Sequence, residues 1–303
     1  MELKAQPDLT ISVISADNAA LLLACLRSVY DTTRQAGLEV WVVDNASADG
    51  TAAAVQAAFP EVKTICNRTR QGFSTNNNLV LHQGLGRYLM LLNDDTLILG
   101  SALDDIVAFM DAHPEAGAVG CAQINPDGSW QHAFGRFPHP FLEGLWPSAN
   151  WSPYLTRGRE EPFEVDWICG AAMLVRREVM GQVGVLDTAF DPIYSEEVDW
   201  CYRIKQAGWK IFLLPHARII HYGGQTMNRA MPRKYELLLS HKALFFRKHR
   251  GRAAAMLYKL ILGFSTAVQL LWWATRSLLQ RGGTGSSEKR ALHWYVLRRI
   301  AAL

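Results

Sequence analysis

Short β-rich runs alternate with helix-period segments over the first 114 residues, and this alternation constrains the fold of the 303-residue chain more than any other feature. Strand and helix alternate four times with short connections between them. This pattern is typical of a doubly wound α/β sheet whose strands are mostly parallel. The expected strands are 9–15, 38–47, 62–67 and 87–95, and the expected helices are 19–33, 49–59, 75–84 and 101–114.

Acidic and amide side chains stand at the ends of two expected strands. The second strand ends in Asp44 and Asn45, and the fourth ends in Asn93, Asp94 and Asp95 with no basic residue beside them. In such sheets the carboxyl ends of the strands face one crevice, where ligands bind. Two adjacent carboxylates are stable in a solvated turn or helix cap, or around a cation. The residues alone leave both interpretations open.

The next part of the chain, residues 125–222, also shows strand and helix signals, but they alternate less regularly. Residues 125–165 are rich in Pro, Trp and Gly, which predicts an irregular excursion over the active face. Another acidic group, Glu196, Glu197 and Asp199, begins an expected helix, where the helix dipole favours carboxylates. The expected elements here are a strand and then a helix in 166–180, a helix over 197–208, strands at 210–215 and 218–222, and a flexible linker at 281–289.

Charge is distributed unevenly along the chain. Residues 1–224 hold 16 Lys and Arg against 26 Asp and Glu, whereas residues 225–303 hold 15 against two, so the net charges are −10 and +13. A basic region of this kind seeks an anionic surface, either nucleic acid or membrane headgroups. We favour the membrane and expect no nucleic-acid partner.

The segment 253–279 supports the membrane interpretation. It is apolar, carries Trp272 and Trp273, and has 16 uncharged residues between Lys259 and Arg276. A perpendicular span needs about 20 apolar residues. We therefore expect an amphipathic helix at the interface, with the Trp pair at headgroup depth. The alternative is a soluble helical hairpin that packs on the body or on a second copy in a homo-oligomer.

Cysteine usage and the N-terminus predict a cytoplasmic protein on the inner face of the plasma membrane. Five cysteines are scattered without a Cys-x-x-Cys pair. This argues against a zinc ribbon or a disulfide framework and for a reducing compartment. The first residues show no apolar stretch after a basic one, so we expect no signal peptide.

Six motifs in order resemble family 2 glycosyltransferases of the GT-A fold, and most closely the bacterial rhamnosyltransferase-like branch. They are "VVDNASADGT", "GFSTNNN", "LLNDDT", "CGAAMLVRREVM", "YSEEVDWCYRIKQAGW" and "LLPHARIIH". The resemblance implies a GT-A domain over residues 1–224, followed by a basic helical region over 225–303. It implies an inverting, Mg²⁺- or Mn²⁺-dependent transfer of a sugar such as rhamnose in cell-surface polysaccharide synthesis. The donor would be a nucleoside diphosphate sugar and the acceptor a saccharide or polyprenyl-linked molecule.

The resemblance also assigns roles to single residues. Asp95 would bind the metal with Asp94 beside it, and His221 matches a metal ligand of some relatives, although a histidine in an apolar strand is more often a core residue. Glu197, paired with Glu196, would be the general base on an element 102 positions after Asp95. The other donor-binding candidates are Asp44 at the base and ribose, Asn45, Asn77, and the glycines Gly72 and Gly170.

The sequence departs from the family pattern in three places, and two of these departures, the missing N-terminal aromatic residue and the Glu-Glu pair, give some support to a second hypothesis. Ala16-Asp17 stands where relatives have an aromatic residue and Asn, Asn93 replaces a possible carboxylate, and the acidic pair is Glu-Glu where Glu-Asp is usual. The alternative is a catalytically inactive sugar-nucleotide-binding or scaffold protein of a polysaccharide assembly. A nucleotidyltransferase ranks last, because "SADNAALLL" lacks the Gly-rich basic loop that such an enzyme needs after its first strand.

Overall fold

The computed structural model describes residues 6–145, 158–223, 231–279 and 284–300. The chain forms two compact units, each described here by itself. The first combines Met1–Phe137 with Ser152–Gly223, and the second combines Pro138–Trp151 with Gly224–Leu303.

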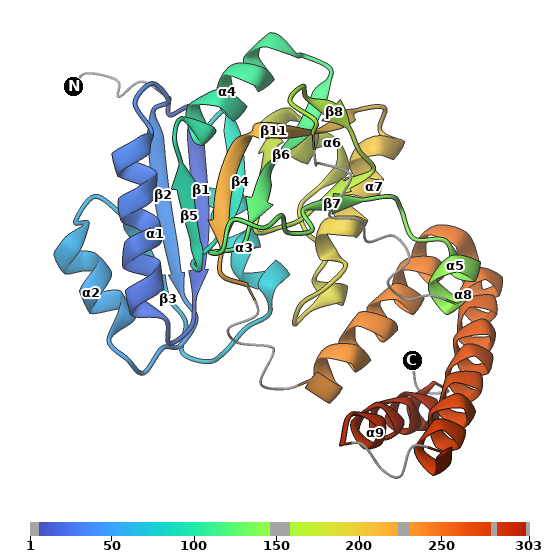
Figure 1. The fold of residues 1–303 in the computed structure, drawn as a ribbon. Helices are drawn as coiled ribbons and strands as arrows, with labels where there is room; N and C mark the ends of the chain where they lie inside the picture. The colour runs from blue at the N-terminus through green and yellow to red at the C-terminus, as the bar shows by residue number, and fades with distance from the viewer. Residues whose placement is uncertain (1–5, 146–157, 224–230, 280–283, 301–303) are drawn as a thin grey trace. The chain divides into compact units, whose positions relative to one another are not determined.

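The first half of the first unit has the expected alternation of strands and helices (Figure 1). Its four strands are parallel and lie in the order β3-β2-β1-β4. The strands are β1 (Leu9–Ser15), β2 (Leu38–Asp44), β3 (Lys63–Cys66) and β4 (Tyr88–Asn93). The helices between them are α1 (Ala19–Thr32), α2 (Thr51–Ala58) and α3 (Phe73–Gln83).

The sheet then becomes mixed, which the alternation did not predict. Beyond β4 the order is β10-β6-β11-β5. Strand β10 is antiparallel to both neighbours, β6 and β11 are parallel, and β5 is antiparallel to β11. The bounds are β5 (Thr96–Leu99), β6 (Ala116–Ile124), β10 (Ala172–Arg176) and β11 (Lys210–His221), with α4 (Ala102–Ala112) between β5 and β6.

The expected pair of strands at 210–215 and 218–222 is one continuous strand, β11. A register shift between Leu214 and Arg218 bends it without ending it. The smaller elements of this unit are β7 (Phe134–Gly135), β8 (Phe163–Glu164), β9 (Trp167–Ile168), α6 (Arg177–Val183), a 3₁₀ turn (Thr188–Phe190) and α7 (Glu196–Gln206).

Two hydrophobic cores cover the two faces of the sheet. Successive residues of a strand point to opposite faces, and in β4 Met90 joins one core while its neighbours Leu89 and Leu91 join the other. Helices α1, α2 and α4 contribute to the first core, and α3, α6 and α7 to the second. The buried face of α1 includes Leu22 and Leu26, one turn apart and fully buried. Each such side chain stabilises the fold by about 1.5–3 kcal/mol.

The second unit is helical. It consists of α5 (Pro140–Leu145), α8 (Met231–Leu279) and α9 (Thr284–Arg299). Gly251, at φ 85°, breaks α8 into two halves. Helix α5 packs on α8 through the Glu143–Lys242 ion pair and through the Ser265 hydroxyl, which donates to the carbonyl of Gly144 at 2.7 Å.

Two expectations fall in this unit. The flexible linker predicted for 281–289 is wrong from Thr284 onward, because α9 begins there. In the described part of the chain one helix, Arg233–Arg276, is long and apolar enough to cross a membrane, with a mean hydropathy of 1.5 in its best window. A buried core helix passes the same test, and 28% of that window is buried, so this observation is weak by itself.

The loop between α1 and β2 is held by one carboxylate. Asp104 of α4 accepts backbone N–H hydrogen bonds from Arg34, Gln35 and Ala36 at 2.8, 3.1 and 3.0 Å. Burial alone raises the pKa of Asp104, but the three amide donors outweigh it and hold the pKa below its ordinary value. The ionised carboxylate therefore stabilises the folded chain.

We expect Asp104→Ala to lower the free energy of unfolding by about 1–3 kcal/mol, because buried amides lose their acceptor. Urea unfolding of the variant and the wild type at neutral pH measures this. The difference should shrink as the pH falls below about 4, because the Asp104 carboxyl of the unfolded chain takes up its proton there, whereas the folded one, with its lowered pKa, does so only at still lower pH. Asp105→Ala, at the next and more exposed position, is the control and should change the stability by less than about 0.5 kcal/mol. Equal effects at both positions would refute the role of Asp104.

Candidate active site

The sequence-predicted site residues gather at one edge of the sheet in the first unit. Asp44 ends β2, Asp94 and Asp95 form the turn after β4, and His221 ends β11. The turn after β4 joins β4 to β5. Because β5 is antiparallel to β11, the start of β5 lies beside the end of β11 at this edge of the sheet. The crevice expected from the strand ends is therefore the place where these polar groups meet.

The β2 end forms a polar network with the segment before α3. The side chain of Asn45 donates to the carbonyl of Gln71 at 3.1 Å and accepts from its N–H at 2.8 Å. Asn67 donates to the same side-chain oxygen at 3.1 Å. Asp44, 7% exposed, accepts from the N–H of Ser47 at 3.0 Å. Asn45 thus orders the loop, while one carboxylate oxygen of Asp44 is used by the turn that follows β2.

Asp17 has a local role that the sequence did not predict. It adopts a left-handed backbone conformation at φ 56°, which non-glycine residues seldom adopt. Its carboxylate accepts from the N–H of Ala48 at 2.6 Å and forms an ion pair with Arg70. Asp17 therefore clips the β1 loop to the β2 loop. Arg70 adds a half-exposed guanidinium that no motif had singled out.

Gly72 and Asn77 serve contacts within the protein. A Cβ at Gly72 would lie 2.1 Å from the carboxyl carbon of Asp191. That carboxylate accepts from the N–H of Ser74 at 2.9 Å, at the start of α3. Asn77 is 1% exposed and accepts from the hydroxyl of Ser12 at 2.8 Å. These contacts account for both residues without a ligand, and their assignment to the donor site stays a prediction.

Asp94 lies half-buried beside a second carboxylate. Burial is the main reason that its pKa is raised to about 6, and the charge of Asp95 raises it further. The hydroxyl of Ser15, at the end of β1, donates to Asp94 at 2.7 Å and opposes this shift. A cation in this turn would therefore be favoured, because it would offset the repulsion between the two carboxylates.

Asp95 and His221 come together, although 126 positions separate them. Oδ1 of Asp95 lies 3.3 Å from Nε2 of His221, and both side chains are nearly buried. Nδ1 of His221 lies 3.0 Å from the side-chain oxygen of Gln123 and 2.9 Å from that of Gln131. Because amide oxygens only accept, the network assigns the proton of the neutral ring to Nδ1 and leaves a lone pair on Nε2.

This arrangement fits a divalent cation. Nε2 of His221 also lies 3.3 Å from the side-chain nitrogen of Asn93. An imidazole nitrogen and a carboxylate oxygen 3.3 Å apart can ligate one divalent cation, and the amide oxygens orient the ring as metal-bound histidines require. Within the described residues, no group of three His, Cys, Asp or Glu side chains forms a metal cluster. Mg²⁺ and Mn²⁺ in nucleotide sites often take only one or two protein ligands and complete their shell with phosphate and water. The sequence analysis did not single out Gln123 or Gln131. Gln123 lies in the otherwise apolar strand β6, and this was a usable signal.

The acidic pair lies at the start of α7. Tyr194 and Ser195, directly before it, have φ values of 87° and 71°. Strained backbone of this kind clusters at functional sites. Burial raises the pKa of Glu197 to about 7. Burial and the charge of Glu197 raise the pKa of Glu196 well above its ordinary value.

Both glutamates keep unsatisfied oxygen atoms. Among the described residues, Oε2 of Glu196 and Oε2 of Glu197 have no hydrogen-bond partner. Gly170 lies beside them, because a Cβ there would be 3.8 Å from Cβ of Glu197 and 3.4 Å from the ring of Phe73. A hydroxyl that enters this space would therefore find an acceptor that is already desolvated.

Helix α7 is anchored firmly behind the pair. Asp199, fully buried, accepts from Nε of Arg203 at 2.9 Å. Arg203 also donates to the carbonyls of Val183 and Val185, and the indole N–H of Trp200 donates to the carbonyl of Gly184 at 2.9 Å. Asp199 therefore positions α7. The acidic run of the sequence motif thus contains an anchoring residue, Asp199, beside the candidate general bases Glu196 and Glu197.

Comparison with known proteins decides the family. The sequence matches the family described as Glycosyl transferase family 2 over residues 10–184. The chain belongs to this family. The protein is therefore an enzyme that transfers a sugar, as the six motifs predicted.

Two curated relatives confirm the likeness to the rhamnosyltransferase-like branch. The N-acetylglucosaminyl-diphospho-decaprenol L-rhamnosyltransferase of Mycobacterium tuberculosis is 29% identical over 213 residues, which cover 63% of this chain and 69% of that protein. The O-antigen biosynthesis protein RfbC of Myxococcus xanthus is 28% identical over 227 residues. They cover 71% of this chain but only 17% of RfbC.

A solved structure confirms the GT-A fold. The mannosyltransferase PcManGT from Pyrobaculum calidifontis, in complex with GDP-Man and Mn²⁺, superposes with a TM-score of 0.61 at 20% identity. The match covers 99% of this chain and 87% of that one. At this identity the likeness establishes the fold and leaves the donor of this glycosyltransferase to its own residues.

The raised pKa values give a testable pH dependence of stability. A carboxyl whose folded pKa lies above its unfolded value of about 4.3 stabilises the fold at low pH and loses that contribution as the pH rises through the folded pKa. For Glu197 this window ends near its folded pKa of about 7. We expect Glu197→Gln to remain folded and to lose less stability than the wild type between about pH 5 and pH 8.

Thermal unfolding of the metal-free chain across this range measures the effect. Glu178→Gln, at an exposed carboxylate on α6, is the control and should follow the wild-type profile. Parallel pH profiles for Glu197→Gln and the wild type would show that the carboxyl does not titrate near neutrality.

Proposed function

We propose that this glycosyltransferase is an inverting, divalent-metal-dependent enzyme that transfers a deoxyhexose such as rhamnose from a nucleoside diphosphate sugar to a lipid-linked saccharide. The observation that carries the proposal is the Asp95–His221 pair, with 3.3 Å between Oδ1 and Nε2, on the same unit as Glu197, whose pKa desolvation raises to about 7.

The metal end of the site would hold the donor diphosphate. Asp95 and His221 are the protein ligands, with Asp94 beside them. The cation, when bound, neutralises charge that develops on the leaving diphosphate. An imidazole nitrogen among the ligands favours Mn²⁺ over the harder Mg²⁺. At the end of β2, the carboxylate of Asp44 provides an acceptor for ribose or base hydroxyl and amine groups.

The second end of the site would accept a proton. Glu197 takes the proton from the acceptor hydroxyl as that hydroxyl attacks the anomeric carbon. A pKa near the working pH keeps a fraction ionised and still basic enough to act. Attack from the side opposite the diphosphate, in one displacement, inverts the anomeric centre. Glu196 is a second buried carboxyl, and because burial and the charge of Glu197 raise its pKa, it is the protonated member of the pair when Glu197 is ionised.

The acceptor assignment rests on the relatives and on charge. The Mycobacterium tuberculosis relative is named for a decaprenol-linked acceptor, and RfbC for O-antigen biosynthesis. The basic C-terminal region of this chain complements an anionic membrane, where such an acceptor would be presented. The enzyme would therefore work as a peripheral protein on the cytoplasmic face of the plasma membrane. Retention of carboxylates at both ends of the site gives no support to the inactive alternative.

Asp95→Ala should abolish metal-dependent donor binding. In the wild type, a nucleoside diphosphate with Mn²⁺ should raise the unfolding temperature, because a ligand that binds only the folded state stabilises it. We expect the variant to lose this shift and to lose roughly 10²–10³-fold in transfer rate, the equivalent of several kcal/mol of charge stabilisation. Asp105→Ala is the matched control and should keep both. Full binding of UDP and dTDP with Mn²⁺ by Asp95→Ala would refute the metal assignment.

Glu197→Gln should separate binding from chemistry. Glutamine keeps the shape but takes no proton, so donor affinity should stay near wild type while the transfer rate falls by roughly 10²–10⁴-fold. Glu196→Gln should be milder, and Glu197→Asp should keep measurable activity. Rates with each donor, and donor hydrolysis with and without Mn²⁺, provide the measurement. If Glu196→Gln is the inactive variant, the base is Glu196, and if both variants keep full activity the base lies elsewhere.

A further inference from the structure

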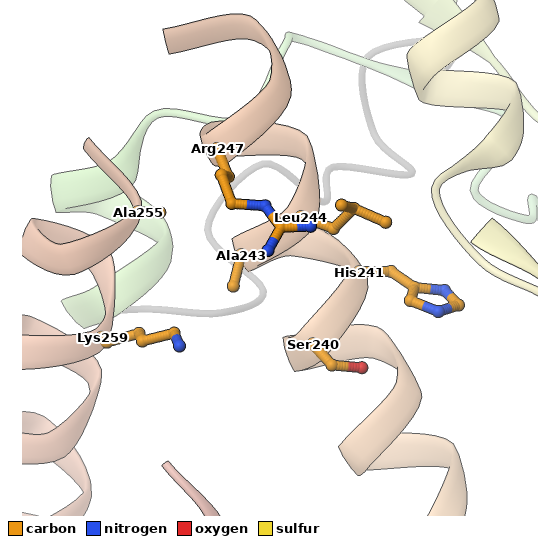
Figure 2. Close-up of a pocket in the computed structure, with 7 residues that line it drawn as sticks. All are labelled: Ser240, His241, Ala243, Leu244, Arg247, Ala255 and Lys259. Carbon is orange, nitrogen blue, oxygen red and sulfur yellow. The ribbon is translucent and has the colours of Figure 1, made fainter. Parts of the chain in front are cut away.

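The break in α8 creates a pocket that the transfer reaction does not use. Gly251 turns the helix back, so that residues before the break face residues after it within the second unit. The pocket between the two halves has a volume of about 280 Å³ (Figure 2). Its walls are Ser240, His241, Ala243, Leu244 and Arg247 on the first half and Ala255 and Lys259 on the second.

Small side chains make room in this pocket and long cations reach into it. Ala243 and Ala255 are both buried, one on each half. Arg247 and Lys259 extend from the two halves toward the space between them (Figure 2). The volume is several times the roughly 30 Å³ that a water molecule occupies in the liquid. The pocket can therefore hold a tetrahedral anion together with bound water.

The positive charge of the pocket is uncompensated. Among the described residues, neither Arg247 nor Lys259 has a carboxylate partner, and no acidic residue lines the pocket. Two other cations of the unit do have carboxylate partners, because Lys242 pairs with Glu143 and Arg299 pairs with Glu236. Two like charges held on facing helices repel each other, so an anion between them would stabilise the hairpin.

We propose that this pocket binds a phosphate group, with the Arg247 guanidinium as a forked donor and the Lys259 ammonium as a point charge. Guanidinium geometry matches two phosphate oxygens at once, and an ammonium complements it from another side. The shared chemistry is a phosphate ester, carried by a membrane lipid headgroup or by a soluble compound. The inference rests on the second unit alone and does not require the proposed donor chemistry.

The surface of the same helix favours a lipid as the carrier. The second half of α8 exposes large apolar side chains at a spacing of about one turn, with Leu260, Phe264 and Leu271 each more than 60% exposed. Lys259 lies between the exposed Leu260 and the buried Tyr258, at the border of this apolar face. A helix with its apolar face in the acyl boundary holds such border cations at headgroup level.

Vesicle flotation of the full chain tests the proposal. The probes are vesicles of phosphatidylcholine alone and of equal parts phosphatidylcholine and phosphatidylglycerol. We expect Arg247→Ala and Lys259→Ala each to weaken binding to the anionic vesicles by about tenfold or more, as loss of a charge-assisted hydrogen bond does. Arg252→Ala removes the same charge at an exposed position next to the break and should weaken binding by at most about fivefold.

A charge-preserving pair of variants separates the pocket from general electrostatics. Ala255→Leu fills the pocket and should weaken binding as Arg247→Ala does, whereas Ala253→Leu, at an exposed position, should not weaken it. If Arg247→Ala and Arg252→Ala have equal effects and Ala255→Leu binds as the wild type does, the chain responds to surface charge alone and the proposal is wrong.

A soluble arm identifies the carrier of the phosphate. Inorganic phosphate is titrated against the wild type and Ala255→Leu in EDTA, with the unfolding temperature as the readout. Stabilisation of the wild type alone assigns the pocket to soluble phosphate compounds, and a response confined to vesicles assigns it to lipid. A response to neither probe overturns the proposal. Each variant must keep the wild-type shift with UDP and Mn²⁺, which reports the fold and the donor site independently of this pocket.

Discussion

The pairing of β11 with β5 is the constraint on which the active site depends. In this antiparallel register His221 stands opposite Thr96, and the N–H of Tyr222 donates to the carbonyl of Asp95 at 2.9 Å. A slip of one residue would turn His221 to the opposite face of the sheet. The side chain would then lose Gln123, Gln131 and Asp95 together. Backbone pairing, rather than any attraction between the side chains, brings the two metal-ligand candidates into contact.

The carboxyl groups of the site share a second property, which is that they are removed from water without a full set of hydrogen bonds. Asp94 and Glu197 have raised pKa values mainly because folding removes water from them, and the anchored α7 prevents Glu197 from moving out. An apolar pair of the same shape would make a more stable fold. The enzyme therefore keeps carboxyl groups whose ionisation lowers its folding stability above neutral pH. A cation near Asp94 or a proton on Glu197 would relieve this electrostatic cost.

Periodicity within short segments of the sequence predicted the elements whose structure depends on those segments alone. The buried face of α1 and the acids that end β2 and β4 follow from apolar periodicity and from the direction of parallel strands. The insertion of β10 antiparallel between β4 and β6 does not, because it depends on pairings between segments far apart in sequence. The same holds for Gly72, whose glycine is required by Asp191, and for the glutamines that orient His221. These contacts join residues 90 to 117 positions apart, where periodicity carries no information.

The ion pair between Glu143 and Lys242 has a consequence during synthesis. Its partners are 99 positions apart, and α5 belongs with helices that the ribosome makes later. At roughly 5–20 residues per second, α5 waits about 5–20 s for its partner helix, while the rest of the sheet is synthesised. Nascent chains are thus exposed to chaperones and proteases at this point. A chain cut just after β11 would lack Ile261 and Leu262 of α8, which pack against Gly144, and would leave this part of α5 uncovered.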